Sequence, residues 1–272
     1  MAEKLKYFVN GQFRESKTDK WYDLHNPSTG EITGQAPCCT NDEVLEAIAA
    51  AKAAYPGWSA TPAIKRAQIL YRVRELILER MDELTMSVAK ENGKVWAESE
   101  GDVLKAKEGT ELATQVPSLM MGESIMDASR GYDTVKYREP LGVFAGIVPV
   151  NFPAMIPFGW MAPTCIAAGN TLVLKAASLT PKTAMLFAQL YKDAGVPDGV
   201  INVVTCSRNE INTILEHPDV KGITFVGSTP VGLKIYEKAA ANGKRCQALC
   251  QAKNHALVME DCALERTVAG VI

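Results

Sequence analysis

The sequence predicts an α/β protein with a doubly wound parallel sheet, an N-terminal helical segment and a β-ribbon. After Pro140, short apolar runs such as GVFAGIVPV and NTLVLKAA alternate with helical segments, as in a parallel sheet covered on both faces. Before residue 122, apolar side chains recur at helical spacing. Between these regions, residues 123–139 have the pattern of two extended arms about Arg130-Gly131, with little core of their own. We therefore expect this ribbon to pack against another subunit or domain.

The N-terminal region begins with short strand-like pieces in residues 8–36, whose Asn-Gly and Thr-Gly pairs predict turns and a small hairpin. Thr40 and Glu43 then form a capping box ahead of an apolar helix, which Pro56-Gly57 is expected to end. One longer helix is predicted from Thr61-Pro62 to Asn92-Gly93, with Arg66 on its solvent face. A third helix is predicted from about Val95 to Ser118.

The region after Pro140 carries the sheet. Its later strands are expected at GVINVVTC, GITFVGS, RCQALC and HALVMED (255–261), and a final helix begins at ALERTVAGVI. That pattern stops at Ile272 without a closing glycine, so we expect the sequence to continue in a longer protein.

Composition excludes several classes of protein. The 272 residues are 47% apolar and 22% charged, with 29 Lys and Arg against 31 Asp and Glu, a net charge of −2. This is typical of a globular protein and leaves no basic excess for nucleic acid or an anionic membrane. The start, MAEKLKYF, has no apolar signal region, so a cytoplasmic location is expected. Seven cysteines without a CxxC pair favour reduced thiols over disulfides or zinc.

Three candidate sites fall where predicted strands end. No GxGxxG occurs, but FVGSTPVG joins a strand to a helix, so that Gly227 and Ser228 lie at a helix N-terminus suited to a diphosphate. An ordinary capped turn explains that segment equally well. Asn151, in PVNFP, is an amide donor held between prolines, as an oxyanion site requires. Lys175 either extends to water or binds ribose or phosphate. All three lie at carboxyl ends of strands, where open α/β sheets bind ligands.

The same segments carry a resemblance that covers nearly the whole chain. Eight of them, in order, resemble landmarks of the aldehyde dehydrogenase superfamily: NPSTGE (26–31), PGWSATP (56–62), KENGK (90–94), EPLGV (139–143), PVNFP (149–153), AAGNTLVLK (167–175), AGVPDGVINVV (194–204) and FVGSTPVG (225–232). The resemblance implies an oligomeric NAD(P)-dependent enzyme, a dimer or tetramer, in which a cysteine attacks an aldehyde. It also implies that residues 1–122 are the hairpin and helices of a cofactor-binding domain, 123–139 an oligomerisation β-ribbon, and 140–272 a Rossmann-like core, with the catalytic domain absent.

The resemblance assigns roles residue by residue. Asn151 matches the oxyanion donor, Lys175 the ligand of the adenosine ribose, and Val231 the residue that packs on adenine. Pro149 and Val150 would line the cofactor cleft, and Gly227 and Ser228 the diphosphate. Ser178 stands where NAD-selective members commonly carry an acid. Apart from the resemblance, Arg208 follows the GVINVVTC strand, where it either lies solvated on a loop or binds a 2′-phosphate. We expect NADP to be tolerated beside NAD, although the branch that AKNH (252–255) resembles generally uses NAD.

One departure from the family pattern points to a branch of the superfamily. LCQAK (249–253) puts Leu249 where most members have the glutamate that activates hydrolytic water, which indicates acyl transfer to a thiol such as coenzyme A. AKNH (252–255), NFPAMIPF (151–158) and NGKR (242–245) resemble the CoA-acylating methylmalonate-semialdehyde dehydrogenase branch. That branch normally has an arginine for the substrate carboxylate where Lys105, a point charge, stands here, so the identity of the aldehyde stays open.

The nucleophile of the family matches none of the seven cysteines, because it would lie beyond Ile272. Cys246, Cys250 and Cys262 are nearest in sequence, without an adjacent base. We therefore expect the chain alone to be inactive. A non-catalytic nucleotide-binding or oligomerisation module and a hydrolytic succinate-semialdehyde-type enzyme are the alternatives.

Overall fold

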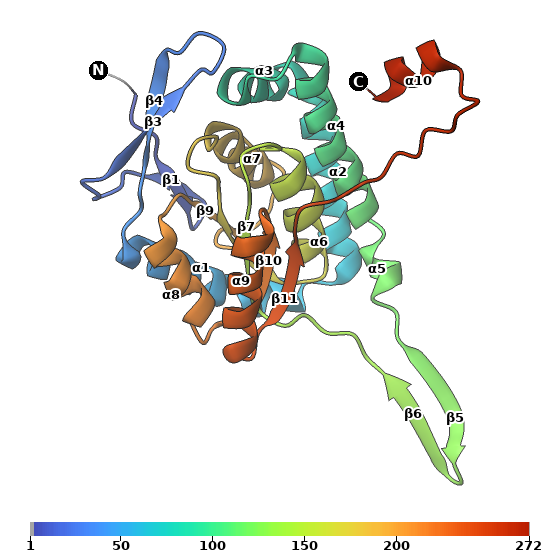
Figure 1. The fold of residues 1–272 in the computed structure, drawn as a ribbon. Coiled ribbons are helices and arrows are strands. Elements are labelled where there is room, and N and C mark those ends of the chain that lie inside the picture. The colour runs from blue at the N-terminus through green and yellow to red at the C-terminus, as the bar shows by residue number, and fades with distance from the viewer. Residues whose placement is uncertain (1–2, 272) are drawn as a thin grey trace.

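A seven-stranded sheet forms the centre of the protein, whose computed structural model describes residues 3–271 (Figure 1). Its strand order is β11-β10-β7-β8-β9-β1-β2. The strands are β1 (Tyr7–Val9), β2 (Gln12–Arg14), β7 (Val143–Ile147), β8 (Thr171–Lys175), β9 (Ile201–Val204), β10 (Val220–Val226) and β11 (Arg245–Leu249). Strands β7 to β11 are parallel, and the β1–β2 hairpin adds antiparallel at the β9 edge. The chain reverses direction across the sheet between β7 and β10, which is the switch point of a doubly wound fold.

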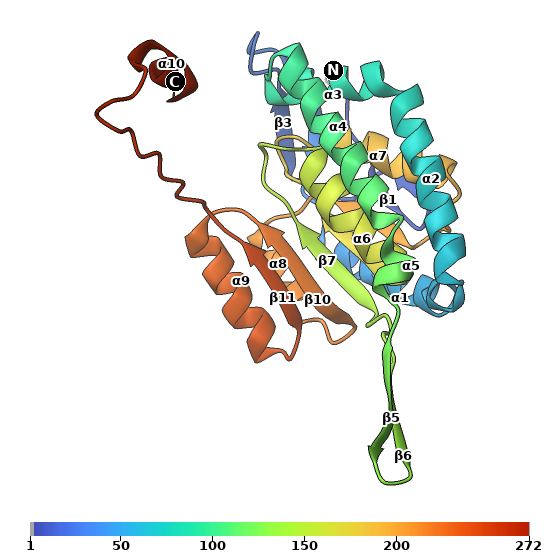
Figure 2. The same ribbon diagram turned by 90° about the vertical axis from the view of Figure 1, so that its right-hand side faces the viewer.

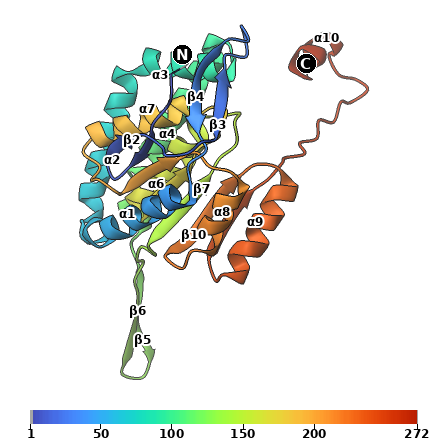
Figure 3. The same cartoon turned by 90° about the vertical axis from the view of Figure 1, so that its left-hand side faces the viewer.

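Helices cover both faces of the sheet, as Figures 2 and 3 show. One face carries α1, α8 and α9, and the other carries the remaining helices of the body. The helices are α1 (Asn41–Ala60), α2 (Ala63–Glu79), α3 (Met81–Asn92), α4 (Trp96–Ala113), α5 (Val116–Leu119), η1 (Ile156–Met161), α6 (Ala162–Ala167), α7 (Lys182–Asp193), α8 (Arg208–Glu216) and α9 (Thr229–Ala241). The predicted α/β class is confirmed.

Strand β8 shows how the sheet divides the core. Leu172 and Leu174 point into the cluster formed with α2 to α7, whereas Val173 points into the cluster formed with α1, α8 and α9. All three are fully buried. Successive residues of a strand face opposite sides, so an uninterrupted apolar run is what a central strand covered on both faces requires.

Two helix boundaries differ from the prediction. Helix α1 continues past Pro56 to Ala60, because Trp58 is buried and its indole N–H donates to the Ile166 carbonyl at 2.9 Å. Burial of that ring offsets the hydrogen bond that proline removes. The predicted long helix is instead two helices, α2 and α3, divided at Arg80, whose φ of −112° and ψ of 22° leave the helical range. Both helices pack on α4, and the break lets α2 also pack on α6 while α3 packs on α7.

Three further predictions need correction. Arg66 is buried rather than solvated, since its Nε donates to the Ala167 carbonyl at 2.9 Å. The N-terminal region contains two hairpins, because β3 (Trp21–His25) and β4 (Ile32–Pro37) form a separate two-stranded sheet. HALVMED (255–261) is not a strand: Leu257 is 87% exposed, and the segment has no strand beside it in the described part of the chain. Pairing with a neighbouring strand is what would hold such a segment extended.

The ribbon and the C-terminal segment project from the body (Figures 1 and 2). Strands β5 (Glu123–Ser129) and β6 (Tyr132–Lys136) pair antiparallel about the predicted turn, where Gly131 has a φ of 79°, and every residue of both strands is exposed. After β11 the chain leads to α10 (Leu264–Val271), which has no buried residue. Within residues 3–271, no helix combines the length and apolar character needed to cross a bilayer.

Candidate cofactor and substrate site

A pocket of about 260 Å³ lies at the switch point of the sheet, at the carboxyl ends of its strands. Lys175 ends β8, Arg208 begins α8 and Val231 lies in the first turn of α9, so the pocket brings together three predicted cofactor residues. Ile147, at the end of β7, belongs to the same wall, and the remaining apolar lining residues are Ile211, Leu215 and Ile235. The pocket therefore combines an apolar slot with cationic groups, which suits a nucleobase attached to ribose or phosphate.

The cations at this pocket have few acidic partners. Lys175 is half-buried and has no ion pair within residues 3–271, and its burial lowers the pKa of the ammonium group. Arg208 is exposed and also has no ion pair in that range. Lys234 and Lys238 of α9 add two further charges, although Lys238 is paired with Glu216. Sequence reasoning missed both α9 lysines; their spacing of four residues, on one face of a helix that begins at the site, was the available signal.

Gly227 and Ser228 join β10 to α9 as predicted, but neither is among the lining residues of this pocket. A Cβ on Gly227 would lie 2.5 Å from Cζ of Phe225, so any larger residue there would require the buried Phe225 ring to shift. Ser228 is the N-cap residue of α9, yet its hydroxyl makes no capping hydrogen bond. Pro230 has no N–H, so the N–H groups of Thr229 and Val231 are those at the start of α9 without an intrahelical partner or a side-chain cap. Ser178 and Pro149 are half-buried in the loops that follow β8 and β7, also outside this pocket.

A larger cavity of about 770 Å³ lies on the side of the sheet that carries α4 and η1. Asn151, Lys105 and Leu249 line it, so the structure brings together the predicted oxyanion donor, the predicted carboxylate ligand and the position that lacks an acid. Asn151 is exposed, and its side chain has no hydrogen-bond partner in the described chain. Its amide is therefore available to a ligand in this cavity. Trp160, Thr224 and Gln247 also line the cavity and had no signal that singled them out in the sequence.

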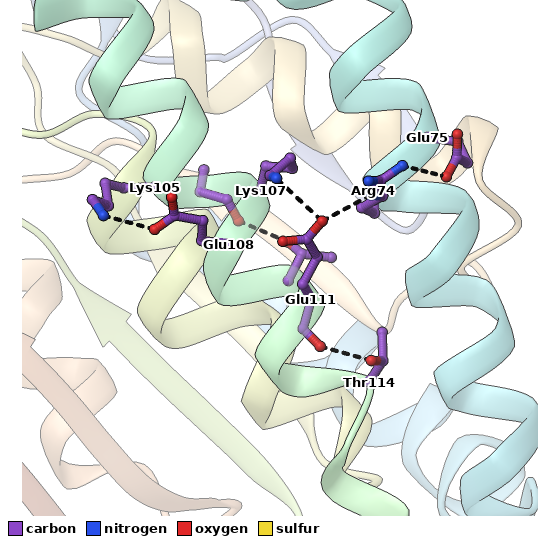
Figure 4. Close-up of polar contacts among 9 residues, drawn as sticks. Arg74, Glu75, Lys105, Lys107, Glu108, Glu111 and Thr114 are labelled. Carbon is purple, nitrogen blue, oxygen red and sulfur yellow. Dashed lines mark hydrogen bonds and ion pairs between the residues drawn. The ribbon is translucent and has the colours of Figure 1, made fainter.

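Lys105 is held by a local ion pair, shown in Figure 4. Its Nζ lies 2.7 Å from Oε2 of Glu108, one turn further along α4, and both side chains are more than half exposed. Lys107 and Arg74 instead reach Glu111, on the side of α4 that faces α2. An exposed pair of this kind is worth at most about 1 kcal/mol, so a substrate carboxylate can compete for Lys105.

Cys39, Cys165 and Cys206 are not activated thiols. Cys250 lines the larger cavity, but its Sγ faces α9, since a Cβ on Gly232 would lie 2.4 Å from it. Burial raises the pKa of Cys39, Cys165 and Cys206 to about 12. A thiol that is protonated at neutral pH is a poor nucleophile.

Two buried carboxylates lie behind the site. Asp102 of α4 is 2% exposed; it accepts the Met155 N–H at 2.7 Å and the Lys94 ammonium at 2.9 Å. Burial raises the pKa of Asp102, and these bonds oppose the rise. Glu91, at 6% exposure, accepts the first N–H groups of α7, from Lys182 at 2.8 Å and Thr183 at 3.0 Å. Sequence reasoning missed both acids as contributors to the site. Glu91 lies within KENGK, which was the available signal.

Parallel strands in this order, with pockets at their carboxyl ends, define a Rossmann-like α/β protein, a class that binds nucleotides across those strand ends. The family model described as "Aldehyde dehydrogenase family" matches residues 13–272. The chain belongs to this family, which is a family of oxidoreductases.

Within this family, the chain is similar to curated semialdehyde dehydrogenases. Malonate-semialdehyde dehydrogenase 2 of Geobacillus kaustophilus (strain HTA426) is 46% identical over 271 residues, 100% of this chain and 56% of the relative. Human methylmalonate-semialdehyde/malonate-semialdehyde dehydrogenase [acylating] is 44% identical over 98% of this chain and 50% of its own length. The chain thus spans about half the length of these relatives.

Solved structures agree with the fold. A protein of Sinorhizobium meliloti 1021, crystallised with NAD, superposes with a TM-score of 0.96 at 35% identity, over 100% of this chain and 55% of that one. Methylmalonate-semialdehyde dehydrogenase (DddC) of Oceanimonas doudoroffii superposes with a TM-score of 0.95 at 39% identity, over 99% of this chain and 55% of that one.

Proposed function

We propose that the protein supplies the cofactor-binding part of an enzyme that oxidises a small semialdehyde with NAD or NADP and transfers the acyl group to coenzyme A. One observation carries the proposal. Strand β7 and the loop that follows it connect two pockets, because Ile147, the last residue of β7, lines the smaller pocket and Asn151, in the loop, lines the larger one. A dinucleotide laid across the carboxyl strand ends would thus extend from the cationic pocket to the amide of Asn151.

The residues fit a dinucleotide. Val231 and Ile147 offer apolar surface to adenine, Lys175 offers an ammonium group to ribose hydroxyls, and the uncapped N-terminus of α9 offers N–H groups to a diphosphate beside Gly227 and Ser228. When bound, the nicotinamide would accept a hydride from the substrate. Pro149 and Val150 would contact its end of the cofactor.

In the larger cavity, Asn151 would donate a hydrogen bond to the aldehyde oxygen as negative charge develops there. Lys105 would bind the substrate carboxylate, as a point charge rather than a bidentate group, and Glu108 would weaken that attraction. Leu249 cannot act as a base toward water, which favours a thiol acceptor over hydrolysis. The acylating relative supports coenzyme A as that acceptor.

We infer that the nucleophile lies outside these 272 residues, so the chain alone is catalytically inactive. The support is the half-length coverage of relatives and the raised thiol pKa values of Cys39, Cys165 and Cys206. Assay of the purified chain with malonate semialdehyde, either cofactor and coenzyme A tests this. Turnover that disappears in Cys250→Ala would overturn the inference, with Cys262→Ala as the matched control.

The cofactor preference and the assembly are also proposals. Ser178 places no acid at its position, and Arg208 and Lys234 add charge at the pocket, which supports binding of NADP beside NAD. The ribbon exposes Ile125 (58%), Tyr132 (72%) and Val135 (52%) without a core of its own, which supports pairing with a second copy. Sedimentation of the chain at several concentrations tests the latter; a monomer throughout would contradict it.

A further inference from the structure

The loop that carries Asn151 is fastened on both sides of that residue. Before it, the Asn92 side-chain amide donates to the Val150 carbonyl at 2.8 Å. After it, the ammonium group of Lys94 lies 3.8 Å from the centroid of the Phe152 ring. Since neither contact uses the Asn151 side chain, the loop is fixed while that amide stays available.

A third contact comes from α4. Asp102 accepts the Met155 N–H and also pairs with Lys94, so one buried carboxylate joins the end of the loop to the cation that covers Phe152. A buried ion pair contributes little net stability, because the cost of desolvating the two charges cancels much of their attraction. Apolar residues of similar size at the same positions would often stabilise the fold equally well. What the pair of Asp102 and Lys94 adds is directional contacts to the loop that carries Asn151.

The neighbouring cofactor loop is tied to the same segment. Thr180, in the loop after β8, donates to the Val150 carbonyl at 3.4 Å, so that carbonyl accepts from both sides. Glu91, adjacent to Asn92, holds the N-terminus of α7, where the loop after β8 ends. The end of α3 therefore sets how the two loops lie relative to each other.

We propose that Asn92, Lys94 and Asp102 are positioning residues, which hold the loop from Pro149 to Met155 in the pose that receives the nicotinamide end of the cofactor. The inference rests on the proposed function, since it assumes that a dinucleotide lies across this loop. None of the three would touch the cofactor or the aldehyde. The adenosine pocket has no lining residue in this loop, so its affinity for a mononucleotide is independent of the three contacts.

Calorimetry of the chain with NAD and with adenosine monophosphate separates the two ends of the site. We expect Asn92→Ala to weaken NAD binding about two- to tenfold, as for one hydrogen bond, and to leave adenosine monophosphate binding unchanged. Asn92→Asp, which keeps the shape but loses the donor, should behave in the same way. Asn242→Ala is the matched control, because Asn242 also donates to a backbone carbonyl at 2.8 Å near a helix end, and should change neither affinity.

The outcomes are distinguishable. Unchanged NAD affinity in Asn92→Ala, or a parallel loss of both nucleotides, overturns the positioning role while leaving the proposed function intact. If the unmodified chain binds neither nucleotide, the proposed function fails and the inference with it. Asp102→Asn, which keeps an acceptor for Met155 but disrupts the pair with Lys94, should reduce NAD affinity selectively; a parallel loss of both nucleotides contradicts the role of the pair.

Discussion

Replacement of Glu91 by glutamine should change how stability depends on pH. Burial raises the pKa of this carboxyl from an ordinary value of 4.5 to about 7, against the opposing effect of its bonds from Lys182 and Thr183. Between these values the folded protein holds a proton that the unfolded chain has released. The free energy of unfolding therefore falls as pH rises. The fall is about 1.4 kcal/mol per pH unit, and about 3 kcal/mol between the two pKa values.

Glutamine does not titrate, so Glu91→Gln should remove this loss. We expect the unfolding free energy of the variant, relative to the unmodified chain, to rise by about 3 kcal/mol between pH 4.5 and pH 7.5. Urea unfolding at intervals of half a pH unit measures the difference directly.

Glu83→Gln on the same helix is the control, because the hydrogen bond from Arg80 lowers the pKa of Glu83 and gives a dependence of opposite sign. Its contribution is present at neutral pH and is lost as pH falls. If the unfolding free energies of Glu91→Gln and of the unmodified chain change in parallel with pH, the reasoning is refuted. If the unfolding free energy of the variant falls relative to the unmodified chain as pH rises, the bonds from α7 lower the pKa of Glu91 by more than burial raises it.

Three further changes have expected outcomes. In a catalytically complete version of the protein, Asn151→Ala should raise the barrier to turnover by about 2.7 to 4 kcal/mol with little change in cofactor affinity, measured by steady-state kinetics and calorimetry; equal losses in both would mark Asn151 as structural. Arg208→Ala should weaken NADP binding by about tenfold or more and leave NAD binding unchanged, and equal affinities in variant and unmodified chain would exclude a 2′-phosphate contact. Leu174→Ala, at a fully buried position of β8, should reduce the free energy of unfolding by about 2 to 5 kcal/mol in urea, whereas a change below 1 kcal/mol would contradict its place in the core.

The sheet was predictable because the apolar runs of its strands indicate burial on both faces. The run TLVLK is apolar on both faces, and the structure places it as β8 between two core clusters. The capping box was also predictable, since it involves only Thr40 and Glu43, three residues apart. The backbone N–H of each residue donates to the side chain of the other, and both bonds are present. Local patterns of this kind need no knowledge of distant contacts.

The failures came from contacts distant in sequence. Arg66 has the spacing of a solvent-facing residue. It is nevertheless buried, and its Nε donates to the carbonyl of Ala167, which is 101 residues away in the sequence. The continuation of α1 past Pro56 depends likewise on Trp58 and the carbonyl of Ile166. Asp102 was overlooked as part of the site because its partner, the Met155 N–H, is 53 residues away. A single sequence gives no signal for such pairs.

The most direct test of the proposed function is calorimetry of this chain with NAD, with and without Lys175→Met. We expect the chain to bind one NAD, and the substitution to weaken binding more than tenfold, because a charged hydrogen bond at a half-buried site is worth about 1.5 to 3 kcal/mol. Lys221→Met, which removes an exposed lysine outside the pocket, should leave the affinity unchanged. Absence of NAD and NADP binding, or an equal affinity in Lys175→Met and the unmodified chain, would contradict a dinucleotide site at the switch point of the sheet.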